Sequence, residues 1–223
     1  MARYIELGED GAGVVDAARL LQEGHLVAFP TDTVYGLGAH LRRPDAIQKL
    51  YVSKGRPEGK PIPVLVSDPE CVSVLATSVP PVAQELMQRF FPGPLTVVVP
   101  AADSVPPQVT AGSGSVGVRM PNHQLALAII RECGGSLAVT SANLSGVREC
   151  LTADEVMQQL GSELVYVLNG PPAPGGIPST VVDATVVPPV VRRVGALPID
   201  LLLDAVPELR RANGHATARV EDG

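Results

Sequence analysis

The sequence predicts an α/β protein with one domain, in which helices flank a twisted β-sheet of mixed strand directions. Three observations support this fold class. Apolar residues make up 45% of the 223 residues, which is enough for a hydrophobic core. Segments with helical spacing of apolar residues and short strand-like runs follow one another, but not in strict strand–helix–strand order. Neither an internal repeat nor a convincing linker divides the chain.

The predicted helices are the segments in which apolar residues recur every three to four positions. Gly24 is a stop signal for the first helix, and Pro44 suits the first turn of the second. Thr152 followed by Glu155 has the spacing of an N-terminal capping box. The predicted helices cover residues 14–21, 44–53, 81–90, 125–132 and 153–160.

The predicted strands are short apolar runs bounded by glycine, proline or polar residues. They cover residues 25–29, 62–66, 95–99, 116–119, 137–139, 164–168, 179–183 and 190–194, the last two as an antiparallel pair. Pro30 ends the first strand, so we expect residues 31–38 to form a loop at its carboxyl end. Ligands of open α/β sheets bind at such strand ends.

We expect one folded domain over residues 1–206 and a polar, disordered tail over residues 207–223. Cys71, Cys133 and Cys150 form no Cys-x-x-Cys pair, which favours a reducing, cytoplasmic setting over a disulfide framework or a zinc ribbon. The first residues have no secretory signal, and no apolar run has the length of a membrane span. We therefore expect no membrane association.

The lysines of this chain all lie in one window, as Lys49, Lys54 and Lys60. The net charge of −6 argues against a general nucleic-acid coat, but it allows a local basic pocket. In the phrase KGRPEGK at 54–60, cations stand on a backbone shaped by glycine and proline. Such a loop suits polyphosphate, because glycine lets the main chain approach closely and proline fixes its path. The alternative is a solvated loop that happens to carry charge.

Three further groups of polar residues stand at strand ends. Ser141 and Asn143 follow the strand at 137–139, and their alternative interpretation is an ordinary Ser/Asn turn. Arg119 ends an apolar strand, either to bind an anion or to form a surface salt bridge. Ser179 and Arg193 belong to the two late strands, which could equally form a hairpin with polar ends. The Walker A, dinucleotide-binding and Gly-x-Ser-x-Gly signatures are all absent from the sequence.

Taken together, six ordered motifs resemble the threonylcarbamoyl-AMP synthase family, which has the YrdC-like fold. They are PTDTVYGLG at 30–38, KGRP at 54–57, PGPLT at 92–96, VRMP at 118–121, TSANLSG at 140–146 and STVVD at 179–183. The resemblance runs from about residue 12 to residue 198 in the family's order and spacing. It implies the short, single-domain form of the family, with a large concave pocket.

The resemblance also implies an activity. Members of this family are nucleotidyltransferases that make threonylcarbamoyl-AMP from L-threonine, bicarbonate and ATP, and release pyrophosphate. The product then passes to a tRNA-modifying transferase complex, which acts on the adenosine next to the anticodon. Weak direct binding of tRNA is compatible with this role. Magnesium is expected with the ATP phosphates, without an assigned protein ligand, and no organic prosthetic group is expected.

The family's functional positions map onto this sequence residue by residue. The catalytic positions are Lys54, Arg56, Ser141 and Asn143. The ATP-binding positions are Arg56, Lys60, Ser115, Ser141 and Arg193, and the threonine-binding positions are Thr33, Arg119 and Ser179. Tyr35 is expected at the floor of the pocket.

The chain departs from the family pattern at two places. Leu65 stands where many members carry histidine, and Glu149 opens a Glu-Cys-Leu phrase where members carry Ser-Pro-Thr. Two other functions remain open. One is an RNA-binding module of the same fold without turnover, which the acidic balance and the 3% of aromatic residues disfavour. The other is a carbamoyl-phosphate-using module of hydrogenase maturation, whose accompanying acylphosphatase and zinc-finger segments are absent here.

Overall fold

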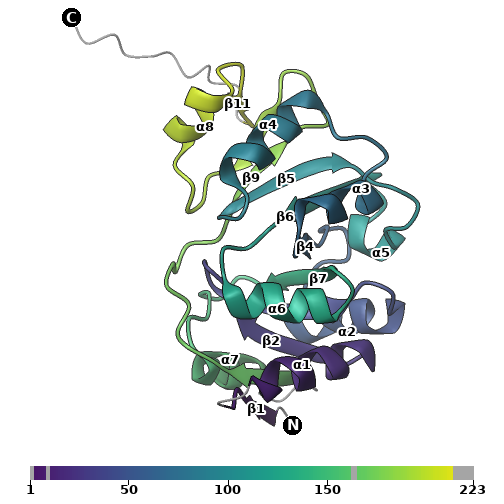
Figure 1. The fold of residues 1–223 in the computed structure, drawn as a ribbon, viewed down its shortest axis with the longest axis vertical. Coiled ribbons are helices and arrows are strands. Elements are labelled where there is room, and N and C mark those ends of the chain that lie inside the picture. Colours follow the sequence, from purple (N-terminus) through teal and green to yellow (C-terminus); the bar gives the residue numbers. More distant parts are fainter. Residues whose placement is uncertain (1–2, 9–10, 162–164, 213–223) are drawn as a thin grey trace, which may run out of the picture.

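One mixed β-sheet of eleven strands runs through the part of the chain that the structure describes (Figure 1). The structure is a computed structural model, and it describes residues 3–8, 11–161 and 165–212. The strands are β1 (Arg3–Glu6), β2 (Leu26–Pro30), β3 (Tyr35–His40), β4 (Val64–Val66), β5 (Leu95–Pro100), β6 (Ser115–Arg119), β7 (Ser136–Ser141), β8 (Val165–Asn169), β9 (Thr180–Asp183), β10 (Val190–Arg193) and β11 (Arg210–Arg211). Their order in the sheet is β1-β8-β2-β3-β7-β4-β6-β5-β9-β10-β11.

The pairing of these strands confirms the predicted mixed sheet. The parallel pairs are β1–β8, β2–β8, β4–β6, β5–β9 and β10–β11. The antiparallel pairs are β2–β3, β3–β7, β4–β7, β5–β6 and β9–β10, so the predicted pairing of the two late strands is confirmed. Because β3 pairs with β7 and β5 pairs with β9, segments from distant parts of the sequence become neighbours.

The helices agree closely with the sequence prediction. They are α1 (Ala12–Gln22), α2 (Pro44–Lys54), α3 (Val72–Leu75), α4 (Pro81–Phe90), α5 (Pro107–Thr110), α6 (Gln124–Glu132), α7 (Ala153–Leu160) and α8 (Ile199–Ala205), with a 3₁₀ turn η1 (Pro69–Cys71). Thr152 caps α7 as predicted, because its Oγ1 accepts a hydrogen bond of 3.2 Å from the amide of Glu155. The Glu155 carboxylate bonds the amide of Leu151, one residue before the cap. Sequence reasoning missed α3, α5 and α8.

The sheet has a hydrophobic core on each face. Val27 and Phe29 of β2 belong to the core that α1 and α6 cover, whereas Leu26 and Ala28 belong to the core under α2, α4 and α7. This alternation follows from the strand geometry, in which successive side chains point to opposite faces. Every helix in the described ranges is too short or too polar to cross a lipid bilayer.

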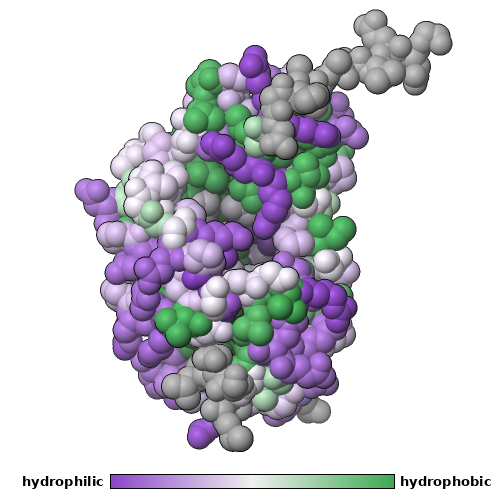
Figure 2. Space-filling view, turned by 180° about the vertical axis from the view of Figure 1, so that it is seen from behind, coloured by the Kyte–Doolittle hydropathy of each residue, from purple (hydrophilic) through white to green (hydrophobic). Residues whose placement is uncertain are grey.

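The strands β5 and β6, in the upper part of Figure 1, turn one face to the core and the other to a pocket. Val97 of β5 and Val118 of β6 are fully buried in the core with α4. Their neighbours Thr96 and Arg119 point to the opposite face and line a pocket. Figure 2 shows the side of the molecule opposite to that of Figure 1, and this side is hollowed near its middle, with hydrophilic side chains around the hollow.

The predicted loop at residues 31–38 is wrong beyond Val34, because β3 begins at Tyr35. Glycine is disfavoured in strands, so Gly36 and Gly38 concealed this one. Tertiary packing explains both glycines. A Cβ at Gly36 would lie 2.8 Å from Cγ1 of Val139, and one at Gly38 would lie 2.9 Å from Cε1 of Phe29.

The chain also stays ordered beyond residue 206, where we expected a tail. Leu209 is buried, and Arg210 and Arg211 pair in parallel with Val190 and Val191. A single buried leucine in a polar segment gives no periodic signal, so this strand was missed, as was β1 at the other edge of the sheet. The rest of the predicted tail, residues 213–223, and residue 164 of the predicted strand 164–168 lie outside the described residues.

Candidate active site

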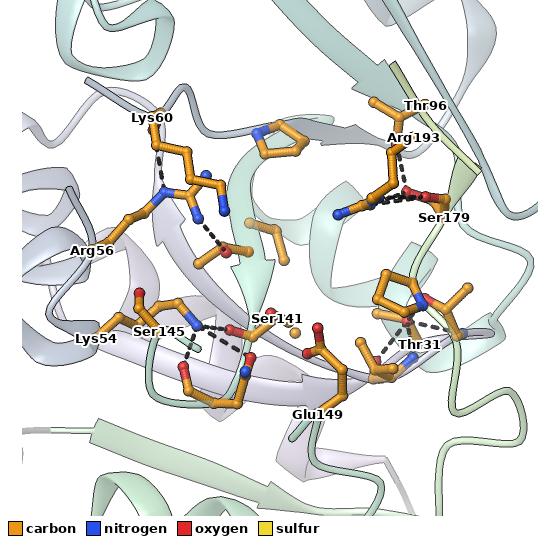
Figure 3. A pocket seen from close by; sticks show the side chains of 18 of the residues that line it. Thr31, Lys54, Arg56, Lys60, Thr96, Ser141, Ser145, Glu149, Ser179 and Arg193 are labelled. Carbon is orange, nitrogen blue, oxygen red and sulfur yellow. Dashed lines mark hydrogen bonds between the residues drawn. The ribbon is translucent and has the colours of Figure 1, made fainter. Parts of the chain in front are cut away.

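A pocket of about 620 Å³ gathers nearly all the residues that the sequence predicted for the site (Figure 3). This volume is in the range of small-molecule and cofactor sites. The predicted residues that line it are Thr33, Lys54, Arg56, Lys60, Arg119, Ser141, Asn143, Ser179 and Arg193. They come from β6, β7, β10, the end of α2 and the loops beside them. Ser115 is the exception.

The register of the sheet explains why these residues meet. Leu65 of β4 is paired with Arg119 of β6, and Gly36 of β3 is paired with Ser141 of β7. Directly paired residues of neighbouring strands point to the same face of a sheet. All four residues line the pocket, so its floor is one face of the strands β3, β7, β4 and β6.

Lys54 is the last residue of α2. The sequence had indicated that it lies in a loop, and that expectation is wrong. Gly55 ends the helix in the left-handed conformation, with φ 57°. The Lys54 side chain then runs inward and only 3% of the residue is exposed. Its Nζ donates to the carbonyl oxygens of Ser141 and Asn143, and lies 3.3 Å from Oδ1 of Asn143. The lysine therefore holds the Ser-Ala-Asn loop in place.

The same surroundings change the acidity of Lys54. Burial lowers the pKa of its ammonium group from 10.5 to about 8, and the Glu149 carboxylate opposes this change. Burial acts this way because a low-dielectric environment disfavours the charged form. Lys54 is thus a cation whose charge is sensitive to pH just above neutrality.

We expect this pKa to control anion binding. Above pH 8 the free protein loses the Lys54 proton, so its affinity for inorganic triphosphate should fall by up to about tenfold per pH unit. The sign follows from the charged form being the one that attracts phosphate. Calorimetric titration of triphosphate between pH 7 and 9.5, with Lys54→Met as the comparison, checks this. An alkaline loss of equal steepness in Lys54→Met would assign it to another group.

Arg56 and Lys60 form the second part of the cationic side. The Arg56 guanidinium is held by the loop itself, through hydrogen bonds of 3.2 Å to the Lys60 carbonyl and 2.6 Å to the Pro61 carbonyl. Its Nη1 also lies 3.5 Å from Oγ1 of Thr140. The Gly/Pro-rich loop therefore supplies the acceptors that fix its arginine. In Figure 3 the side chains of Lys54, Arg56 and Lys60 lie together on one side of the pocket.

Arg119 lies buried at the other end of the pocket. Its Nη2 bonds Oδ1 of Asp32 at 2.6 Å, its Nη1 bonds Oγ1 of Thr33 at 3.0 Å, and its Nε bonds the Gly93 carbonyl at 3.0 Å. Of the two interpretations of Arg119, the surface salt bridge is excluded, because the Arg119 side chain is only 7% exposed. An arginine has five N–H donors, so two remain for a ligand.

Ser179 and Arg193 join Arg119 from the last strands of the sheet. Arg193 donates to the Ser179 carbonyl through both Nε and Nη2, at 3.1 and 2.8 Å. The Ser179 hydroxyl lies 2.8 Å from that of Thr96. Gly195 allows this approach, because a Cβ there would lie 2.1 Å from the Pro178 carbonyl oxygen. Thr96 belongs to the motif PGPLT at 92–96, but no sequence signal distinguishes it from the rest of that motif.

Two predicted positions lie elsewhere. Ser115 begins β6 while Arg119 ends it, so about 13 Å of strand separates them. The Ser115 hydroxyl lies 3.0 Å from that of Ser113 and is not part of the pocket lining. Tyr35 was expected at the pocket floor, which is wrong. It alternates with Gly36, so its ring is buried on the opposite face, and its hydroxyl bonds the Gly170 carbonyl at 3.1 Å.

Glu149 is a pocket residue to which the sequence assigned no role. It is the one acidic side chain among the described residues that line the pocket, against five cationic ones. The pocket is therefore strongly positive within a chain of net charge −6, which favours an anionic ligand. The described residues contain no cluster of three side chains that would hold a metal ion.

The mixed sheet and the charges of the pocket lining indicate an anion-binding α/β protein. Its pocket has the cations Lys54, Arg56 and Lys60 on one side and the buried Arg119, with free donors, on the other.

Comparisons with known proteins specify the family. The family model of Sua5, YciO and YrdC proteins, described as "Telomere recombination", matches residues 19–195. The threonylcarbamoyl-AMP synthase of Bacillus subtilis is 42% identical over 86% of this chain and 56% of its own length. That of Vibrio parahaemolyticus is 37% identical over 74% of this chain and 90% of its own length.

A solved Sua5 structure has a fold similar to that of this chain. The crystal structure of Pyrococcus abyssi Sua5 complexed with L-threonine has a TM-score of 0.89 and 36% identity, over 95% of this chain and 62% of that one. The chain thus spans little more than half the length of several relatives that it matches. The chain belongs to the Sua5/YciO/YrdC family. The two relatives named above, from Bacillus subtilis and Vibrio parahaemolyticus, are threonylcarbamoyl-AMP synthases.

Proposed function

We propose that this chain is an L-threonylcarbamoyladenylate synthase, a nucleotidyltransferase that converts L-threonine, bicarbonate and ATP into threonylcarbamoyl-AMP and pyrophosphate. The observation that carries the proposal is one pocket that joins two kinds of anion site. Lys54, Arg56 and Lys60 suit a triphosphate, and Arg119 with its two free donors suits a carboxylate. The names of the relatives and the threonine complex of the Pyrococcus abyssi protein support the same assignment.

The reaction has two steps. The threonine ammonium group first loses a proton to solvent; the resulting amine attacks the bicarbonate carbon, an N–C bond forms and water leaves, which gives a carbamate. A carbamate oxygen then attacks the α-phosphorus of ATP, and the bond to the departing pyrophosphate breaks. Both partners in the second step are anions, so they repel each other. Lys54 and Arg56 offset this repulsion and stabilise the charge on pyrophosphate.

Threonine is expected at the Arg119 end of the pocket. Arg119 pairs with its carboxylate, while the hydroxyl groups of Thr33 and Ser179 face the amino acid. The rigidity of this end supports the assignment, because Asp32 and the Gly93 carbonyl already fix the guanidinium. Binding then needs little ordering of the side chains.

ATP is expected across the cationic side. Arg56, Lys60 and Arg193 neutralise its phosphates, and Ser141 and Asn143 complete the contacts to the nucleotide and the intermediate. The Lys54 hydrogen bonds hold these two loop residues ready for binding. Ser115 remains a predicted ATP contact, although this structure places it away from the pocket lining.

Magnesium and the downstream partners complete the proposal. Magnesium keeps several waters and commonly binds through substrate phosphates, which suits a pocket with a single carboxylate, that of Glu149. We place the reaction in the cytoplasm, in keeping with the free cysteines Cys71, Cys133 and Cys150. A tRNA-modifying transferase complex then consumes the reactive product, with at most weak binding of tRNA by this chain.

The test is release of pyrophosphate by the purified chain. We expect release that requires ATP, bicarbonate and L-threonine together, and that stops when any one of them is omitted. Glycine in place of threonine serves as the control for amino acid recognition. Release of pyrophosphate that does not depend on threonine contradicts the proposal. Tight, salt-resistant RNA binding without turnover would instead favour an RNA-binding module.

A further inference from the structure

Glu149 lies where the two halves of the pocket meet. The backbone on each side of it is anchored to a different half. The Val147 carbonyl accepts a hydrogen bond of 2.6 Å from Nδ2 of Asn143, in the loop that Lys54 holds. The Cys150 carbonyl accepts one of 2.9 Å from the amide of Tyr35, directly after the Thr33 end of the pocket. In Figure 3 the Glu149 side chain stands between those of Ser141 and Thr31.

The Glu149 carboxylate has no partner within the described part of the protein. Its Oε2 is buried, and it is the one buried side-chain nitrogen or oxygen there that lacks a hydrogen bond. A buried polar atom without a donor is unfavourable, and the more so when it is charged. Buried polar atoms without a hydrogen-bond partner are rare in native proteins. In a binding pocket, a ligand can supply the missing donor.

The nearby cations Lys54 and Arg193 do not donate a hydrogen bond to Glu149. Burial lowers the pKa of Lys54 and of Arg193, and the Glu149 carboxylate opposes both changes, so it is close enough to interact with both. Lys54, however, donates to oxygens of Ser141 and Asn143, and Arg193 donates to the Ser179 carbonyl. Neither cation forms a hydrogen bond with Glu149, whose Oε2 remains without a donor on the pocket wall.

We propose that Glu149 accepts a hydrogen bond from the α-amino group of the amino acid substrate and thereby sets the preference of the pocket for an amino acid. The inference rests on the proposed function. An amino acid carries its ammonium group one carbon away from its carboxylate. In a pocket lined by five cationic side chains, the ammonium group is repelled unless an anion lies close to it. Glu149 is the one carboxylate of the described lining that can play this part.

The same hydrogen bond persists along the reaction. A carbamate nitrogen retains one hydrogen, so it still donates to Glu149 after the amine has reacted. Glu149 would thus keep the nitrogen fixed while the new carbamate group turns toward the cations Lys54 and Arg56. Glu149 is therefore a specificity-determining and positioning residue, and no proton transfer to it is required.

The experiment compares two ligands and three proteins by calorimetry. The ligands are L-threonine and its analogue 2,3-dihydroxybutanoate, which has a hydroxyl group in place of the ammonium group. The proteins are the wild type, Glu149→Gln and the control Glu70→Gln, which removes the same charge at an exposed position outside the pocket. Circular dichroism and thermal unfolding show whether each variant is folded.

We expect Glu149→Gln to weaken threonine binding by roughly 10- to 100-fold, the usual effect of a charge-assisted hydrogen bond. Binding of the dihydroxy analogue should change by less than about threefold, because the analogue has no ammonium group that interacts with the Glu149 carboxylate. Glu70→Gln should bind both ligands as the wild type does. The preference of the wild type for threonine over the analogue should therefore disappear in Glu149→Gln alone.

Three other results would each overturn the inference. Equal threonine affinity in the wild type and Glu149→Gln removes any role in recognition. Equal weakening of both ligands indicates a structural role. In a further titration of the same proteins with ATP, with and without magnesium, an altered magnesium requirement together with unchanged threonine affinity assigns the carboxylate to the metal. If the wild type itself does not bind threonine, the proposed function fails first, and the inference fails with it.

Discussion

Lys54→Met is expected to lower kcat/KM for threonine-dependent pyrophosphate release by about 10²- to 10³-fold, the usual cost of one preorganised charge at a transition state. Methionine preserves most of the length of the side chain but removes its charge. Stability should change by less than about 2 kcal/mol, because two effects oppose each other. The unpaired carbonyls of Ser141 and Asn143 destabilise the fold, whereas removing a buried cation relieves its desolvation.

Lys49→Met is the matched control for this variant. Lys49 stands on the same helix, one and a half turns earlier, where half of its side chain is exposed and its Nζ lies 3.6 Å from Asp45. The same substitution there should leave the rate within about twofold, because an exposed ion pair contributes little. Steady-state kinetics with thermal unfolding of both variants provides the measurement. Activity of Lys54→Met near that of the control would remove Lys54 from the catalytic assignment.

Arg119→Met is expected to abolish measurable threonine binding and to destabilise the protein by about 3–5 kcal/mol. The destabilisation arises because the Asp32 side chain, 12% exposed, would lose its ion-pair partner in a buried position. Urea unfolding and threonine titration provide the two measurements. Arg131→Met is the control, because its ion pair with Asp68 is 3.7 Å long and exposed, so its loss should cost at most about 1 kcal/mol.

A double variant separates stability from binding. Asp32→Asn combined with Arg119→Met removes both charges, so much of the lost stability should return. Threonine affinity should not return, because the carboxylate-binding donors are still missing. A double variant that binds threonine as well as the wild type would show that Arg119 acts only through the fold. A loss specific to ATP would mean that the two ends of the pocket have been exchanged.

Much of the fold follows from local signals in the sequence. Gly55 ends α2 in the left-handed conformation, and the Thr152 hydroxyl begins α7 through a hydrogen bond three residues away. Such effects depend on nearest neighbours in the chain, so they are readable without a structure. Local signals did not predict β3. Its two glycines are required by close contacts with Val139 and Phe29, which come from other strands.

The sequence also predicted which residues form the site, but it did not predict their burial or their hydrogen-bond partners. The resemblance of six motifs indicated Lys54, Arg119 and Ser179, and all three line the pocket. It gave no hint that Lys54 is buried or that Arg119 is paired with Asp32. It gave Glu149 no role, because this residue departs from the family pattern and its importance comes only from what surrounds it.

The fold class, most helices and strands, and the set of polar residues that the family uses can therefore be predicted from the amino-acid sequence alone. These depend on side-chain type, periodicity and spacing along the chain. The face of the sheet on which each residue lies becomes clear from the folded protein, which places Gly36 in the pocket and Tyr35 in the core. The tertiary structure also sets the hydrogen-bond partners of Lys54 and lowers its pKa, and it leaves the Glu149 carboxylate without a donor. Burial and hydrogen bonding depend on residues brought together from distant parts of the chain, and no local pattern encodes them.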